Sequence, residues 1–179
     1  GDYLKCLRTE TVPGIDVSAF QGEVDWERVA ASGIKLAFVS VGYRGYGKAG
    51  TLVEDEYARR NLEGARAAGL EVGVYFFSQA VNTQEVKEEV DFMMQIMGDF
   101  QPDLPVVFDW ERVRNENSRS VEMDRRTLTD CAKTFLETIE LAGYNAMVYF
   151  NAHQSRNLYY LSELKEYDFW LASYTDRMD

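Results

Sequence analysis

The sequence contains few of the residues that build metal clusters and disulfide frameworks. Its 179 residues include two cysteines, Cys6 and Cys131, and one histidine, His153. Two cysteines this far apart exclude a disulfide-rich fold and a cysteine metal cluster, and leave open a single bridge between them. Cys131 falls on the apolar face of a predicted helix, where a buried structural thiol is the simpler interpretation. One histidine argues against a histidine-rich zinc site, so we expect neither a metal nor a cofactor.

Long apolar runs and an excess of positive charge are missing as well. No apolar stretch approaches the roughly 18 residues of a membrane span. The 30 acidic residues outnumber the 19 basic ones, which gives a formal net charge of −11. Because such a field repels polyanions, nucleic acid is not an expected partner. The first residues lack the basic flank and apolar core of a secretory signal peptide, and the missing initiator Met predicts a processed or recombinant start.

The residues that are present fit one globular domain. A chain of this length that is 46% hydrophobic can bury a substantial core, so we expect a single domain over residues 1–179, with 1–12 as a lead-in segment. Apolar runs and turn residues predict strands at 13–18, 35–41, 71–79, 106–111, 146–150 and 169–174. Helical spacing and cap residues predict helices after Asp25, at about 55–68, after Asn82, at about 125–142 and at 155–164.

Two segments between these elements are glycine-rich or highly polar. The glycines of residues 42–50 lack the spacing of a phosphate-binding loop, so we interpret this segment as a flexible rim. Residues 112–124 are long and charged, which predicts a loop that either covers the site or lies in solvent.

Alternating strands and helices predict a parallel sheet, either doubly wound or closed into a barrel. Polar residues fall at the carboxyl ends of several predicted strands: Asp16, Gln79, Asp109, Glu111, Asn151 and Tyr174. Contributions from many strands favour the barrel, because barrel enzymes assemble their sites from the carboxyl ends of their strands.

The strongest chemical signal is a pair of acids that ends the apolar run at 104–111. Asp109 and Glu111 are separated by one residue, so on a strand both project to the same side, with α-carbons about 6.5 to 7 Å apart. Neighbouring carboxylates disfavour each other's ionisation, and apolar surroundings raise their pKa further. One acid can then keep its proton near neutral pH while the other stays charged, as glycosidic cleavage requires. Two solvated acids at a strand end are the commoner meaning of an isolated Asp-x-Glu.

Short motifs along the chain supply the context that this pair needs. They occur in the order GIDVS (14–18), DW (25–26), GL (69–70), YFF (75–77), FDWE (108–111), VYFN (148–151) and WLASY (170–174). Together they resemble the glycoside hydrolase family 25 lysozymes, which are N-acetylmuramidases of bacterial and phage origin. The resemblance implies an α/β fold, an irregular TIM-like barrel with fewer helices than strands. It also implies a monomer that acts outside the cell or at the wall.

The resemblance further implies the chemistry and the residues that perform it. Family members cleave the β-1,4 bond between N-acetylmuramic acid and N-acetylglucosamine in peptidoglycan. By position, Glu111 corresponds to the general acid, Asp109 to the group that stabilises the sugar cation or orients its acetamido group, and Asp16 to an acid on the opposite wall. Spacing leaves open whether Asp109 attacks, activates water or assists the acetamido oxygen; similarity to other acetamido-sugar hydrolases favours the last. The sugar-contacting aromatics would be Tyr75, Tyr149, Trp170 and Tyr174.

Two departures from the family pattern leave other functions open. Phe76 stands where many members have histidine, and the chain stops at Asp179 where the family continues through further strands. We therefore expect the C-terminal strands to be missing and the barrel to have open edges. A catalytically weak domain that binds cell-wall carbohydrate, and a chitinase-like hydrolase of another acetamido sugar, are the competing interpretations.

Overall fold

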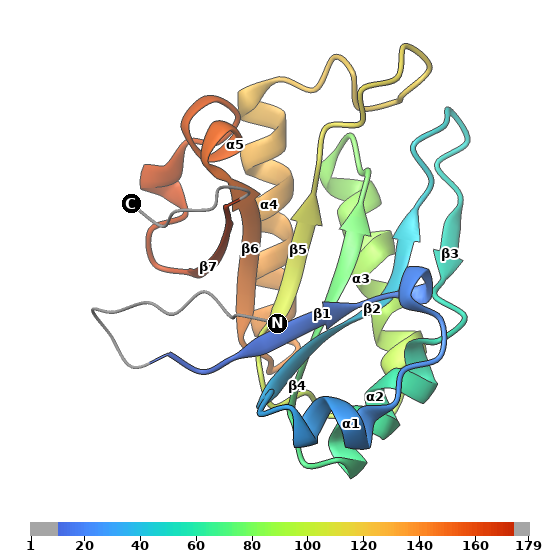
Figure 1. Ribbon diagram of the computed structural model, residues 1–179. Helices are drawn as coiled ribbons and strands as arrows, with labels where there is room; N and C mark the ends of the chain where they lie inside the picture. Colours follow the sequence, from blue (N-terminus) through green and yellow to red (C-terminus); the bar gives the residue numbers. More distant parts are fainter. Residues whose placement is uncertain (1–10, 174–179) are drawn as a thin grey trace.

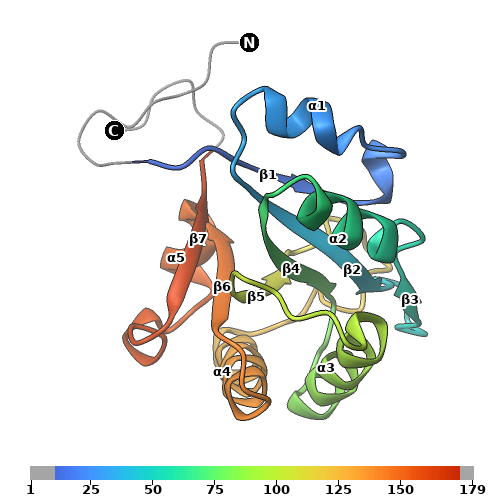
Figure 2. The same ribbon diagram turned by 90° about the horizontal axis from the view of Figure 1, so that it is seen from below.

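The computed structural model describes residues 11–173, in which seven strands form one curled sheet with helices on its outer side (Figures 1 and 2). The strands are β1 (Gly14–Val17), β2 (Leu36–Arg44), β3 (Leu52–Glu54), β4 (Glu71–Ser78), β5 (Val106–Trp110), β6 (Ala146–Asn151) and β7 (Asp168–Ala172). Their order is β1-β2-β4-β5-β6-β7, and every pair on this path is parallel; β3 pairs with β2 in the antiparallel sense.

Five α-helices and two short 3-10 turns connect the strands within these residues. The helices are α1 (Trp26–Ala31), α2 (Ala58–Ala67), α3 (Thr83–Met97), α4 (Arg125–Leu141) and α5 (Ala152–Asn157), and the turns are η1 (Ala19–Gln21) and η2 (Leu161–Glu163). The predicted caps form, because Asp25 accepts a hydrogen bond from the Arg28 N–H and Asn82 accepts one from the Glu85 N–H. None of the helices within residues 11–173 has the length and apolar character needed to cross a membrane.

The core lies between the sheet and the helices, which leaves the concave face of the sheet for a ligand. Alternate residues of β4 and β5, such as Val74, Phe76 and Phe108, are fully buried. The residues between them, Tyr75, Phe77 and Asp109, are only partly buried. Phe76 is therefore a core residue.

The predicted α/β class with a curled parallel sheet is confirmed, but the sheet formed by the described residues is a half-barrel and not a full TIM-like barrel. In the described part of the chain, β1 and β7 are the two ends of the path and are not paired with each other. The curl nevertheless brings their neighbourhoods together, since the rings of Phe38 on β2 and Trp170 on β7 have centroids 5.1 Å apart. Closing such a barrel takes about eight strands, and only six lie on this path.

Three predicted boundaries are wrong. The segment 42–50 is not all loop, because Gly42 to Arg44 continue β2 and pair with the short strand β3, which the sequence analysis missed. The helix predicted from residue 55 begins at Ala58, since the Asp55 carboxylate instead accepts hydrogen bonds from the N–H groups of Ala19 and Tyr57. The helix predicted at 155–164 is α5, which begins at Ala152 after an Asn151 cap, followed by η2.

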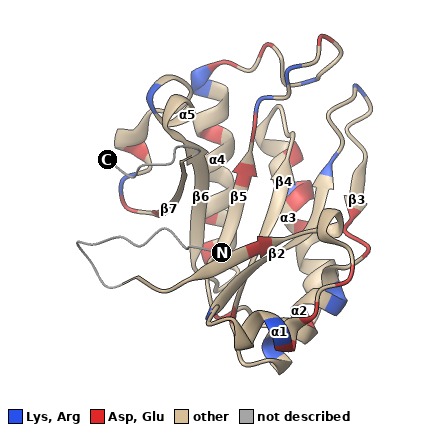
Figure 3. Cartoon of the chain, in the orientation of Figure 1, with Lys and Arg blue, Asp and Glu red and all other residues tan. Residues whose placement is uncertain are grey.

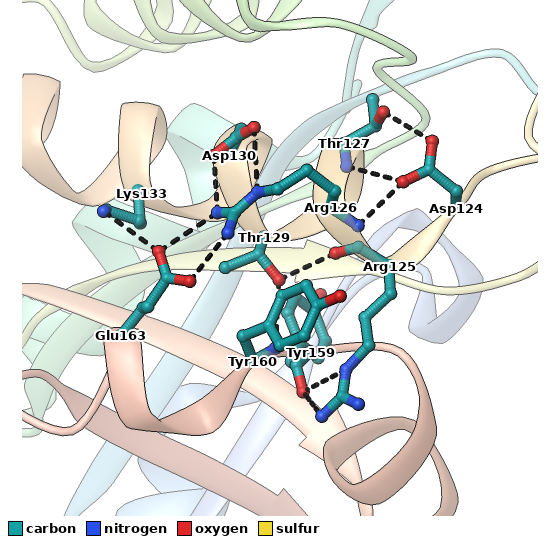
Figure 4. A network of polar contacts seen from close by, with 10 residues as sticks. All are labelled: Asp124, Arg125, Arg126, Thr127, Thr129, Asp130, Lys133, Tyr159, Tyr160 and Glu163. Atoms are coloured by element: carbon teal, nitrogen blue, oxygen red, sulfur yellow. Dashed lines mark hydrogen bonds and ion pairs between the residues drawn. The ribbon is translucent and has the colours of Figure 1, made fainter.

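Hydrogen bonds and ion pairs connect the segment between α5 and β7 to α4 (Figure 4). Arg126 on α4 forms ion pairs with Asp130 at 2.6 Å and with Glu163 on η2 at 2.7 Å. Arg125 donates a hydrogen bond to the Tyr159 carbonyl at 2.9 Å. Cys131, on the buried face of the same helix, is a free thiol as expected, and Cys6 lies outside the described residues.

Candidate active site

The two acids at the end of β5 reach the concave face of the sheet. Asp109 is the fourth residue of β5 and pairs in register with Phe77 on one side and Tyr149 on the other. Trp110 points to the opposite side and is fully buried. Glu111 follows directly after the strand and is half-buried. The alternation predicted from the sequence is therefore present up to the last residue of the strand.

Asp16, Asp109 and Glu111 form one electrostatic group. Burial raises the pKa of Asp109 well above its usual range, and the charges of Glu111 and then Asp16 raise it further. Burial also raises the pKa of Glu111 and of Asp16, the latter against a backbone hydrogen bond that lowers it. Figure 3 shows acidic positions in red on β1 and at the carboxyl end of β5. The fold thus brings Asp16 into the same group as two acids that lie 93 and 95 residues later in the chain.

Tyr75, Tyr149 and Trp170 meet beside these acids. The Trp170 ring lies 5.3 Å from that of Tyr149 and 6.5 Å from that of Tyr75, in edge-to-face geometry. Burial, followed by the charges of Asp16 and Asp109, raises the pKa of Tyr75, so the charges of both acids act on this phenol. Three of the four predicted sugar-contacting aromatics therefore form one cluster. Tyr174 lies outside the described residues.

A cleft of about 420 Å³ opens where β1 and β2 face β6 and β7. Asp16, Phe38 and Trp170 line it together with Gly14, Ile15, Leu36, Met147 and Phe169. Its volume is in the range of small-molecule binding sites, and Asp16 is the acid that reaches it. Asp109 and Glu111 lie outside its lining, toward the carboxyl ends of the strands.

Buried amides that the sequence analysis did not assign a role hold the end of β5. Gln79 donates a hydrogen bond to the Glu111 carbonyl at 2.7 Å, and Gln154 donates one to the Trp110 carbonyl at 3.1 Å. Gln79 was visible as a polar residue at a strand end. Gln154 could have been found as the partner of Asn151 in an Asn-x-x-Gln capping box, whereas nothing in the sequence pointed to Ser120, which donates to Gln79.

Within residues 11–173, no cluster of three histidine, cysteine, aspartate or glutamate side chains has the arrangement of a metal site.

The raised pKa of Asp109 predicts a pH-dependent cost to folding. Between the ordinary pKa and the raised one, Asp109 is protonated in the folded protein but ionised in the unfolded chain. The free energy of unfolding therefore falls as pH rises through this range. Asp109→Asn should therefore increase the free energy of unfolding at pH 8 by about 0.5–2 kcal/mol, and by less at pH 5. Urea unfolding at both pH values, with the exposed Asp99→Asn as control, measures this; equal gains at the two pH values would contradict it.

Sequence comparison agrees with this geometry. The sequence model of glycosyl hydrolases family 25 matches residues 15–179. This chain belongs to that family. Among curated relatives, uncharacterized protein YegX of Escherichia coli strain K12 is 28% identical over 176 residues, which cover 93% of this chain and 58% of YegX. Lysozyme M1 of Streptomyces globisporus is 30% identical over 106 residues, which cover 58% of this chain and 34% of that protein. The chain thus spans little more than half of YegX.

Solved structures of other proteins have the same fold. The modular autolysin LytC from Streptococcus pneumoniae, in complex with a synthetic peptidoglycan ligand, matches with a TM-score of 0.80 at 21% identity, over 93% of this chain and 38% of LytC. A family 25 glycosyl hydrolase from Bacillus anthracis matches with a TM-score of 0.75 at 20% identity, over 98% of this chain and 76% of that one. The family match over residues 15–179 confirms the resemblance inferred from the seven motifs, and these structures show the same fold.

Proposed function

We propose that this family 25 chain is a muramidase domain that cleaves the β-1,4 bond between N-acetylmuramic acid and N-acetylglucosamine in peptidoglycan. The observation that carries the proposal is the electrostatic grouping of Asp16, Asp109 and Glu111 on the concave face of the sheet. The family match over residues 15–179 supports one catalytic domain behind a short lead-in segment. The peptidoglycan ligand in the LytC structure supports a glycan strand as substrate, and a protein that acts on this substrate would work outside the cell or at the wall.

In this proposal Glu111 is the general acid. It is half-buried, so it retains contact with the space where a sugar binds, and burial raises its pKa toward neutrality. Burial disfavours the charged form of a carboxyl group, so Glu111 keeps its proton to higher pH than an exposed glutamate does. A proton then remains available to Glu111 at a pH where an isolated glutamate is charged. Transfer of that proton to the glycosidic oxygen lets the bond to the anomeric carbon break.

Asp109 and Asp16 would act on the sugar that becomes positively charged. Asp109 lies deepest, where it can stabilise that charge or hold the acetamido group so that its carbonyl oxygen attacks the anomeric carbon. Water then restores the sugar hydroxyl and returns a proton to the site. Tyr75, Tyr149 and Trp170, and by family resemblance Tyr174, would stack on the sugar faces. The cleft along β1 and β7 would continue the binding surface.

The product of wall digestion tests both the activity and the bond. Purified cell walls are incubated with the protein, and the new reducing ends are reduced with borohydride before acid hydrolysis. Conversion of muramic acid to its alditol is expected, whereas conversion of glucosamine would place cleavage at the other bond. Hydrolysis of chitin oligomers without hydrolysis of walls would instead identify a different acetamido-sugar hydrolase.

A second candidate is a domain that binds cell-wall carbohydrate without cleaving it. The open sheet favours this alternative, because β1 and β7 carry unpaired edges within the described residues. Sedimentation with purified walls, without release of reducing ends under any tested condition, would support binding over catalysis.

The net charge of −11 predicts an unusual salt dependence. Many wall polymers are anionic, so repulsion slows encounter at low ionic strength. Raising NaCl from 10 to 150 mM shortens the screening length from about 30 to 8 Å and should increase the initial rate on walls about twofold or more. An uncharged soluble oligosaccharide substrate serves as control and should show no such rise. A rate on walls that falls steadily from the lowest salt upward would contradict the prediction.

A further inference from the structure

The proposed proton donor is not held by the sheet itself. The last residue of β5 is Trp110, which pairs with Ser78 of β4, and Glu111 follows beyond the end of this ladder. A residue outside a ladder lacks the regular backbone hydrogen bonds that fix its neighbours. The direction of the Glu111 side chain therefore depends on other contacts to its backbone.

Gln79 holds the peptide group that follows Glu111. It comes directly after β4, is fully buried, and donates hydrogen bonds from Nε2 to the carbonyls of Glu111 at 2.7 Å and of Ser78 at 2.9 Å. Its Oε1 accepts a hydrogen bond from the Ser120 hydroxyl at 2.7 Å. Ser120 is also fully buried and lies in the 112–124 segment that follows Glu111. Gln79 thus fixes both the Glu111 carbonyl and the returning loop.

Gln154 holds the peptide group that precedes Glu111. It lies in the first turn of α5, is 4% exposed, and donates a hydrogen bond from Nε2 to the Trp110 carbonyl at 3.1 Å. Its Oε1 accepts a hydrogen bond from the Asn151 N–H at 3.1 Å, which closes the α5 capping box. The orientation of its amide is therefore set by the helix that carries it.

These two contacts determine how Glu111 is oriented. Each peptide group is planar, so the conformation of a residue is given by the two rotations that relate the planes before and after it. Anchoring the carbonyls of both planes restricts both rotations at Glu111, and with them the direction of its Cα–Cβ bond. We propose that Gln79 and Gln154 are positioning residues that aim the Glu111 carboxyl at the glycosidic oxygen. The inference rests on the proposed role of Glu111.

Isosteric substitution tests the inference. Gln79→Met and Gln154→Met keep the side-chain length but remove the amide donor, so the Glu111 backbone loses one anchor in each variant. A general acid that is poorly oriented toward the glycosidic oxygen lowers the rate of the chemical step. We therefore expect kcat on a soluble peptidoglycan oligosaccharide to fall about tenfold or more, whereas KM should change less than about twofold. Thr129→Val is the matched control, since Thr129 is also fully buried and makes two hydrogen bonds, to Arg125 and Tyr160, away from Glu111.

A second substrate separates positioning from a general loss of structure. In an aryl glycoside of the same sugar made with an acidic phenol, the phenolate leaves without being protonated. Hydrolysis of this substrate therefore does not need a correctly oriented proton donor. The two glutamine variants and Glu111→Gln should all lose activity on the oligosaccharide and retain it on the aryl glycoside. Equal losses on both substrates, or no loss on either, would overturn the positioning role. If one glutamine variant does not fold, the other decides, because each anchors one side of Glu111.

The result also distinguishes this inference from the proposed function. Full oligosaccharide activity in Glu111→Gln would overturn the role of Glu111 and the positioning role with it. The positioning role alone would be overturned if Glu111→Gln lost activity on the oligosaccharide but not on the aryl glycoside, while Gln79→Met and Gln154→Met showed no such difference between the two substrates.

Discussion

Replacing Glu111 by glutamine should lower kcat on peptidoglycan oligosaccharides by about 10² to 10⁴-fold, the usual contribution of a general acid. Glutamine keeps the size of the side chain and can still donate a hydrogen bond to the glycosidic oxygen, but it has no proton to transfer. Binding should change little, so the loss is expected in kcat and not in KM. Reducing ends released from a soluble oligosaccharide measure both constants.

Two controls make this expectation specific. Glu140→Gln removes an exposed glutamate from α4 and should leave activity unchanged. The pH profile gives a second check: because burial raises the pKa of Glu111, the parent's kcat should decline only above the ordinary glutamate range, and this decline should disappear in Glu111→Gln.

Wild-type activity in Glu111→Gln would transfer the acid role to Asp109. Asp109 is the more deeply buried of the two and experiences the charges of both other acids, so it binds a proton more tightly in the free protein. Asp109 lies one residue inside the end of β5, whereas Glu111 follows directly after the strand. Activity measurements on Asp109→Asn and Glu111→Gln in parallel therefore separate the two assignments.

The sequence predicted the parts of the fold that follow from local patterns. Apolar runs placed β4 and β5 closely, and the period of a strand put Asp109 on the concave side and Trp110 in the core. Cap residues placed α1 and α3. The three-residue strand β3 gave no such signal, because its pairing with β2 depends on how residues 45–51 turn and not on apolar periodicity. Asn151 was assigned to the end of a strand, and its second role as a helix cap shifted the start of α5 away from the predicted position.

The candidate site was predictable as a set of acids but not as an organised site. Motif order brought Asp16 to the same site as Asp109, because the resemblance carried tertiary information that spacing alone lacks. The anchors of Glu111 come from side chains 32 and 43 residues away in the chain, in segments with no shared pattern. Hydrogen bonds of this kind depend on which strand ends become neighbours, and parallel pairing is decided by the whole fold.

Outside the candidate site, the buried ion pair between Arg44 and Glu89 should have the largest effect on stability among the variants proposed for this protein. Arg44 at the end of β2 is 4% exposed, Glu89 on α3 is fully buried, and their Nε and Oε1 atoms are 2.7 Å apart. Arg44 also donates hydrogen bonds to the carbonyls of Gly50 and Glu85, both at 2.9 Å. One guanidinium therefore joins β2, the β2–β3 connection and α3.

Arg44→Met is expected to reduce the free energy of unfolding by about 3–5 kcal/mol at pH 8, because it leaves a buried carboxylate without its partner. Burial raises the pKa of Glu89 to about 7 even with Arg44 present. At pH 5 the Glu89 carboxyl of the folded protein is mostly neutral. The same substitution then removes hydrogen bonds but leaves no unpaired negative charge in the core, so the loss of unfolding free energy should be smaller. Urea unfolding of parent and variant at the two pH values gives the difference.

Two further variants show whether charge burial is the cause. Arg44→Met combined with Glu89→Met replaces both ions by apolar side chains and should recover much of the loss at pH 8, since an apolar pair of similar volume is often as stable as a buried ion pair. Arg60→Met breaks an ion pair of the same 2.7 Å length with Glu23, but both partners are exposed, so we expect a change of less than about 1 kcal/mol. A loss in Arg44→Met that is equal at pH 5 and pH 8, and unrelieved in the double variant, would show that Arg44 stabilises the fold through its carbonyl contacts and not through its charge.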